Sequence, residues 1–131
     1  IDKVNILEAS MEAMATSVRE VVGRHGVRPG AVLVDGNRVP KQLADLPCEA
    51  VVRGDRKKFA IAAASIIAKV TRDRLMAKLD RKHPQYGFKA HKGYGTASHV
   101  AALKRHGPSP SHRRTFEPVK GFLETGRWGL S

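Results

Sequence analysis

The sequence is poor in several kinds of residue, and each shortage excludes a class of protein. A single cysteine, Cys48, excludes an intrachain disulfide and a multi-cysteine zinc site, and it favours a reducing compartment such as the cytoplasm. No uninterrupted apolar stretch approaches the roughly 20 residues that cross a bilayer, and no charged segment followed by an apolar core opens the chain. We therefore expect neither membrane insertion nor secretion.

Acidic residues are also scarce relative to basic ones. The chain has 12 Asp and Glu against 24 Lys and Arg, which gives a net charge of +12. Such a charge attracts polyanions, so nucleic acid is the leading partner, although a generally basic solvated surface has the same composition. With 41% hydrophobic and 27% charged residues over 131 positions, the composition is that of one globular domain.

Apolar periodicity, composition and capping residues predict three helices of two turns or more. Residues from Val4 to Val21 place an apolar stripe on a helix of about five turns, and that stripe needs a covering element. The alanine-rich segment from Lys58 to Lys82 predicts a longer helix whose apolar first half is buried. Thr96 can cap a third helix that ends at Gly107.

Two short strands are predicted, and an aspartate stands near the end of each. Residues 31–34 form a continuous apolar run before Asp35, and residues 49–53 form a second candidate strand before Asp55. Because adjacent parallel strands end at one edge of a sheet, where open α/β sheets hold ligands, the two carboxylates can lie together. Carboxylate oxygens suit a hard divalent cation such as Mg²⁺. The alternative is that both aspartates are turn formers beside a glycine.

A basic, glycine-rich loop at residues 91–95 is a candidate for contact with a sugar-phosphate backbone. Tyr94 can stack on or hydrogen-bond to a sugar, or it can pack on the domain as an ordinary loop tyrosine. Basic side chains that can contact phosphates, or can simply be solvated, are Lys57, Lys58, Lys92, His112, Arg113 and Arg114.

Other polar residues are given structural interpretations. Asp73 lies between two arginines of a predicted helix, which indicates an ion-paired or solvated residue and not a metal ligand. Four histidines lack the close spacing of a metal cluster and are interpreted as surface or helix-end residues: His25, His83, His99 and His106.

Four ordered blocks closely resemble the bacterial ribonuclease HII family, and the segment NILEASMEAM at 5–14 resembles a helix of the same family. The blocks are VLVDGN at 32–37, GDRKKFAIAAASIIAKVTRDRLM at 54–76, HKGYGT at 91–96 and HRRTFEP at 112–118. Four blocks in the right order are far more specific than any one of them. The resemblance extends to about Val119.

The resemblance implies a ribonuclease H-like α/β fold and an endonuclease. Its substrates would be RNA–DNA hybrids and ribonucleotides embedded in duplex DNA, cut on the 5′ side to leave 3′-hydroxyl and 5′-phosphate ends. It implies two Mg²⁺ or Mn²⁺ ions held by four carboxylates, of which the matching motifs supply Asp35 and Asp55 as catalytic metal ligands. It further implies that Tyr94 senses the ribose 2′-hydroxyl and that Lys57 lies near the active site. Lys92, His112 and Arg113 are expected to bind substrate, and the complete protein is expected to be a cytoplasmic monomer.

This sequence departs from the family pattern at its start. The family opens with a strand that carries an adjacent Asp-Glu pair and with a Gly-Arg-Gly loop, and nothing here matches either one. We therefore expect one incomplete domain over residues 1–131, whose sheet lacks its first strands, with a helix-loop extension at 96–119 and a loosely packed tail at 120–131. Alternatives are a nucleic-acid-binding module without catalysis and a structural fragment without independent function.

Overall fold

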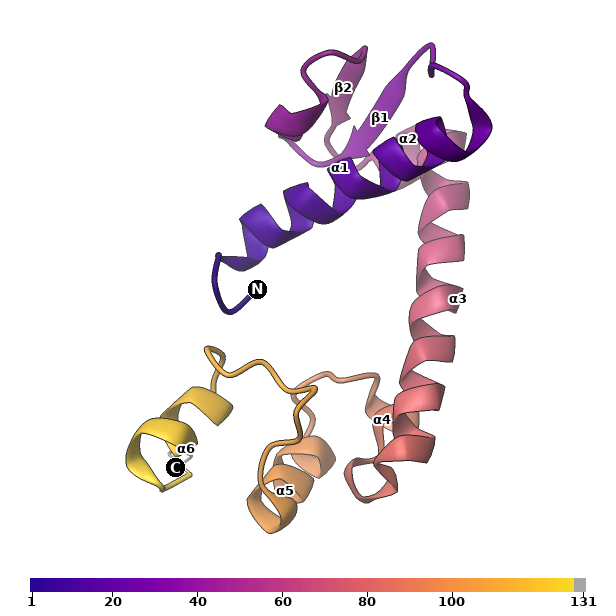
Figure 1. The fold of residues 1–131 in the computed structure, drawn as a ribbon. Helices are drawn as coiled ribbons and strands as arrows, with labels where there is room; N and C mark the ends of the chain where they lie inside the picture. Colours follow the sequence, from indigo (N-terminus) through magenta and orange to yellow (C-terminus); the bar gives the residue numbers. More distant parts are fainter. Residues whose placement is uncertain (129–131) are drawn as a thin grey trace. The chain divides into compact units, whose positions relative to one another are not determined.

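The computed structural model describes residues 1–128 and is built of helices with two short strands (Figure 1). It divides into two compact units, Ile1 with Lys3–Ile67, and Asp2 with the residues from Ala68 onward. The expected single domain stays a prediction. The elements in chain order are α1 (Ile6–His25), β1 (Val32–Asp35), η1 (Lys41–Leu43), β2 (Cys48–Val51), α2 (Gly54–Lys57), α3 (Phe59–Lys82), η2 (Pro84–Tyr86), α4 (Phe88–His91), α5 (Ala97–His106) and α6 (Val119–Thr125).

The two strands pair in parallel in the first unit. Val32 lies opposite Cys48 and Asp35 opposite Val51, so β1 ends at Asp35 as predicted. The second strand ends at Val51, because Arg53 takes a left-handed backbone conformation (φ 57°) and caps α2. A mixed α/β fold with parallel strands is therefore confirmed. The position of Asp55 in the prediction is wrong, since this residue lies in the short helix α2 and not at a strand end.

Helix α1 begins and ends where its capping residues stand. The Asn5 side chain accepts a hydrogen bond from the Glu8 N–H at 2.9 Å, and Gly26 ends the helix in the left-handed conformation (φ 61°). Only Ala15 is buried, in a cluster with Leu43 and Leu46. The predicted apolar stripe is therefore covered only near its middle, because the short segment around η1 is the element that packs against it.

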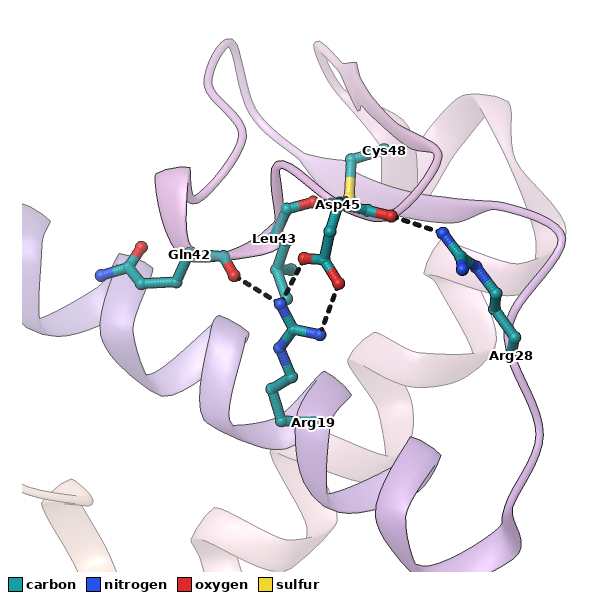
Figure 2. A network of polar contacts seen from close by, with 6 residues as sticks. All are labelled: Arg19, Arg28, Gln42, Leu43, Asp45 and Cys48. Carbon is teal, nitrogen blue, oxygen red and sulfur yellow. Dashed lines mark hydrogen bonds and ion pairs between the residues drawn. The ribbon is translucent and has the colours of Figure 1, made fainter.

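An arginine on α1 holds the segment around η1 in place (Figure 2). The Arg19 guanidinium forms a bidentate ion pair with Asp45 and donates a further hydrogen bond to the Gln42 carbonyl at 2.8 Å. Arg28 donates to the Asp45 carbonyl at 2.7 Å. The hydrogen bond from Arg19 lowers the pKa of the Asp45 carboxyl below its ordinary range. These contacts hold the segment from which Leu43, fully buried, enters the core.

Helix α3 has nearly the predicted bounds, but its predicted burial is wrong. In its first half only Ile61 is buried, whereas Phe59 is 89%, Ile66 64% and Ile67 68% exposed. An all-round apolar composition predicts burial only when other elements lie against every face. In residues 1–128 the first half has no such cover. None of the helices in this part of the chain is long and apolar enough to cross a membrane.

The second unit has its own core. Tyr86, Phe88, Leu103 and Val119 form a buried cluster, and partly buried side chains from α3, α5 and the end of the described chain pack on it. Helix α5 begins at the predicted cap, where the Thr96 hydroxyl oxygen accepts from the His99 N–H at 3.3 Å, and is followed by Gly107. These contacts join α5 to the segments before and after it.

Within the expected loose tail most described residues are exposed, but Trp128 makes packing contacts. Trp128 stacks on Phe122 of α6 with ring centroids 4.1 Å apart, and it also packs on the core of the second unit. The tail prediction rested on the lack of any motif after Val119, which says nothing about packing. The remainder of the predicted tail, residues 129–131, lies outside the described residues.

Candidate active site

The end of β1 and the start of α2 meet through one carboxylate. The Asp35 carboxylate accepts a hydrogen bond from the Gly54 N–H at 2.8 Å, and Asp55 follows directly on α2. Both aspartates are exposed. This hydrogen bond brings the segment that carries Asp55 beside the end of β1, although Asp55 does not end a strand as the argument from parallel strands expected.

Gly54 is buried at the point where β2, α2 and α3 converge. A Cβ atom added there would collide with the Cδ1 atom of Ile61 and would lie 3.4 Å from both the Val51 Cβ and the Asp35 Oδ1. The lack of a side chain at Gly54 thus leaves room for the Ile61 side chain beside the backbone that donates to Asp35. The glycine at position 54 is therefore needed for the packing beside the acidic edge.

The donor set at this edge fits a hard divalent cation. Magnesium in proteins takes one or two carboxylates together with waters and substrate phosphates, and exposed Asp35 and Asp55 oxygens can serve as such ligands. Within residues 1–128, the structure has no group of three or more His, Cys, Asp or Glu side chains placed to hold a metal ion. The assignment of the two aspartates as metal ligands stays a prediction.

Basic side chains flank the acidic edge on the same short helix. Lys57 is exposed at the end of α2, next to Arg56 and Lys58, which are also exposed. Their position on one side of Asp55 lets a phosphate meet positive charge beside the carboxylates. Contact between Lys57 and substrate stays a prediction.

The loop that carries Tyr94 lies in the second unit and is anchored to the second half of α3. The Arg72 guanidinium donates to the Lys92 carbonyl at 3.0 Å and lies 5.6 Å from the centre of the Tyr94 ring. The Tyr94 carbonyl accepts from the Thr96 N–H at 2.8 Å, while the ring is 66% exposed. A fixed backbone with an open aromatic face suits stacking on a sugar or base.

Two other predicted substrate contacts have partners of their own. The Lys92 ammonium lies 3.8 Å from the Asp73 carboxylate, so Asp73 is ion-paired as expected. The Arg113 guanidinium lies over the Phe116 ring, 4.0 Å from its centre. Both basic groups remain partly exposed, so neither arrangement prevents a contact with phosphate.

A histidine cluster is the feature that the sequence interpretation missed. His99, expected at the surface, is only 6% exposed, and its Nε2 atom lies 3.0 Å from Nε2 of His112. His91 is equally buried and stacks on His99. The three residues lie far apart for a sequence motif, so only the folding of α4 and α5 against the following loop reveals them. His112 is engaged inside the unit, and its role in substrate binding stays a prediction.

The described elements thus define a mixed α/β protein with a parallel strand pair and two aspartates at its edge. A family model described as Ribonuclease HII matches residues 1–119. The chain belongs to the ribonuclease HII family, which implies a ribonuclease H-like fold.

Curated relatives agree with this assignment. The chain is 52% identical to the ribonuclease HII of Chromobacterium violaceum over 99% of its own length and 63% of that protein. It is 55% identical to the ribonuclease HII of Magnetococcus marinus, over 94% of the chain and 56% of the relative, and 56% identical to that of Paracidovorax citrulli, over 95% and 49%. The chain therefore spans less than two thirds of the length of these relatives.

Proposed function

We propose that this chain carries part of the active site of an endonuclease that cuts the RNA strand of RNA–DNA hybrids and the 5′ side of ribonucleotides embedded in duplex DNA. The observation that carries the proposal is the hydrogen bond from Gly54 to the Asp35 carboxylate, which joins the two aspartates of the matched motifs at one edge. Membership of the ribonuclease HII family supports the same activity. The products would carry 3′-hydroxyl and 5′-phosphate ends.

Asp35 and Asp55 would hold two Mg²⁺ or Mn²⁺ ions together with carboxylates that this chain does not supply. Bound ions would activate water and stabilise the leaving oxygen during an in-line displacement. The Gly54 N–H fixes one oxygen of Asp35, so the orientation of this carboxylate is set before substrate arrives. Lys57 would balance the charge of the phosphate near this edge.

Tyr94 would recognise the ribose. Its exposed ring can lie against a sugar, and its hydroxyl can hydrogen-bond to the 2′-hydroxyl that distinguishes RNA from DNA. Lys92 and Arg113 would contact backbone phosphates, which position a duplex without reading its sequence. The complete protein would act as a cytoplasmic monomer.

The test is cleavage of a DNA duplex that contains one ribonucleotide, with Mg²⁺ or Mn²⁺ present. The 131-residue chain is assayed alone and together with the part of the Chromobacterium violaceum relative that it does not match. We expect cleavage only in the combined sample, and its loss in Asp35→Asn. Cleavage that survives Asp35→Asn would show that this carboxylate is not a metal ligand.

Duplex binding without catalysis is the second candidate function, and the net charge of +12 favours it. In that case the combined sample binds the duplex, with affinity that falls steeply as salt is raised, yet never cuts it. Asp35→Asn would then leave binding unchanged or slightly stronger, because it removes a negative charge near the phosphates.

A further inference from the structure

Three imidazole rings lie together in the second unit, where α4, α5 and the loop after α5 meet. The His91 and His99 rings stack with centroids 4.1 Å apart and an interplanar angle of 12°. His112 faces His99, with 3.0 Å between their Nε2 atoms. His99 is almost fully buried and His112 is half-buried, so their ring nitrogens need hydrogen-bond partners within the protein.

The backbone at one end of this pair decides the tautomer of His99. Nδ1 of His99 lies 2.9 Å from the Tyr94 carbonyl oxygen. A carbonyl oxygen has no proton, so Nδ1 of His99 must donate. In the neutral ring Nε2 is then a bare acceptor, and it faces His112.

The backbone at the other end decides the tautomer of His112. The Ser109 N–H donates to Nδ1 of His112 at 2.9 Å, and the Ser109 hydroxyl lies 2.8 Å from the same atom. A backbone N–H can only donate, so Nδ1 of His112 must accept. Its proton therefore lies on Nε2 and is donated to His99. The result is one directional chain from Ser109 through His112 and His99 to the Tyr94 carbonyl.

An additional proton costs this series of hydrogen bonds at least one member, although the Ser109 hydroxyl oxygen can accept a proton placed on Nδ1 of His112. A proton on Nε2 of His99 would face the Nε2–H of His112, and a proton on Nδ1 of His112 would face the Ser109 N–H. Either one replaces a hydrogen bond by two donors about 3 Å apart, and this arrangement must open. The series from Ser109 to Tyr94 therefore keeps all of its hydrogen bonds only when both rings are neutral.

We propose that His99 and His112 are positioning residues for Tyr94: their chain of hydrogen bonds holds the Tyr94 loop against the Ser109–Arg113 segment only while both imidazoles are neutral. Acidification then releases the loop and weakens ribose recognition. The proposal deepens the proposed function, because it rests on that function for the role of Tyr94.

The local electrostatics agree with this geometry. Burial lowers the pKa of both His99 and His112 below the ordinary 6.5, and repulsion between them lowers the pKa of His112 further. The other titratable groups that act on the pair are His91 of α4, and His83 and Tyr86 at η2. A lowered pKa means that each imidazole binds a proton less tightly in the closed arrangement than in the open one. The closed arrangement is thus fully favoured above pH 6.5 and loses stability as the pH falls below it.

The deciding experiment is NMR of the imidazole nitrogens in the unmodified 131-residue chain. Long-range proton–nitrogen correlations at neutral pH should show the proton of His99 on Nδ1 and that of His112 on Nε2. On acidification both rings should titrate below the ordinary histidine pKa of 6.5, and the amide signals of the Tyr94 loop should change with them. The opposite tautomers, or titration of either ring at or above the ordinary pKa of 6.5, would overturn the proposal whatever the enzyme does.

The functional consequence is measured by duplex binding of the combined sample described under the proposed function, without metal. The ratio of affinities for a duplex with one ribonucleotide and for all-DNA duplex should fall about fivefold between about pH 8 and pH 5, the loss of roughly one hydrogen bond. His112→Gln should remove this pH dependence, and the matched control His25→Gln should retain it. If the predicted tautomers are seen but the combined sample never prefers the ribonucleotide, the proposed function fails instead. An unchanged ratio across the pH range, with a clear ribonucleotide preference, would refute the positioning role.

Discussion

Replacing Gly54 by alanine perturbs the acidic edge through a single atom. The new Cβ would collide with Cδ1 of Ile61, while its distances of 3.4 Å to Val51 and Asp35 are ordinary contacts. Ile61 is only 7% exposed, so its side chain has little room to move away. Overpacking of this kind costs about 1–3 kcal/mol, and we expect a value near the low end because one terminal methyl group is involved.

A double-mutant cycle separates this collision from other effects. Ile61→Val removes the Cδ1 atom and by itself costs about 1 kcal/mol. Because the collision disappears with Cδ1, Gly54→Ala should then cost little more in the Ile61→Val background, so the two changes together destabilise by about 1 kcal/mol. Simple addition would give roughly 2–3 kcal/mol.

The assay is urea unfolding followed by circular dichroism, with the midpoint and the slope fitted separately. Gly23→Ala is the matched control, since a Cβ at Gly23 meets nothing within 4 Å and alanine favours the α1 helix by about 0.5–1 kcal/mol. Additive free energies for Gly54→Ala and Ile61→Val would refute the collision as the reason for glycine at this position.

Three further changes test the two cores and the ion pair. Leu43→Ala should destabilise by about 2–5 kcal/mol in urea unfolding, because Leu43 is 0% exposed; a cost below 1 kcal/mol would contradict its place in the core. Tyr86→Phe should cost about 1 kcal/mol, since the Tyr86 hydroxyl donates to the Gly107 carbonyl at 2.8 Å, and an unchanged midpoint would mean that water replaces this bond. The stability that Asp45 contributes through Arg19 should be present above pH 3.8 and lost below it, because the folded pKa is lowered. Unfolding measured between about pH 5 and pH 3 should therefore depend less on pH in Asp45→Asn, and equal slopes would argue against the ion pair.

Local features of the chain were predictable because they depend on neighbouring residues. The Thr96 side chain caps α5 as predicted, and Gly107 follows the last residue of that helix. The apolar run before Asp35 predicts a strand by its length and its residue types. The four motif blocks likewise indicate the family directly from their order, without any knowledge of tertiary contacts.

The tertiary structure decided which apolar faces are buried and which polar groups form hydrogen bonds with each other. Helical periodicity identifies an apolar face on α1 and an apolar first half of α3, but whether these are covered depends on which elements pack there. The left-handed conformation of Arg53 turns the chain into α2 and moves Asp55 off the strand end. The hydrogen bond between Gly54 and Asp35 then brings that helix back to the first strand.

The pair of His99 and His112 separates most clearly what the sequence determines from what the fold determines. By itself the sequence determined the capped helix that carries His99 and the basic loop that carries His112, since both follow from local composition. Only the fold brought the two rings to 3.0 Å and placed a backbone acceptor at one end and a backbone donor at the other. The physical reason is that hydrogen-bond direction depends on which groups meet in space, and residues 13 positions apart meet only after the intervening loop has folded.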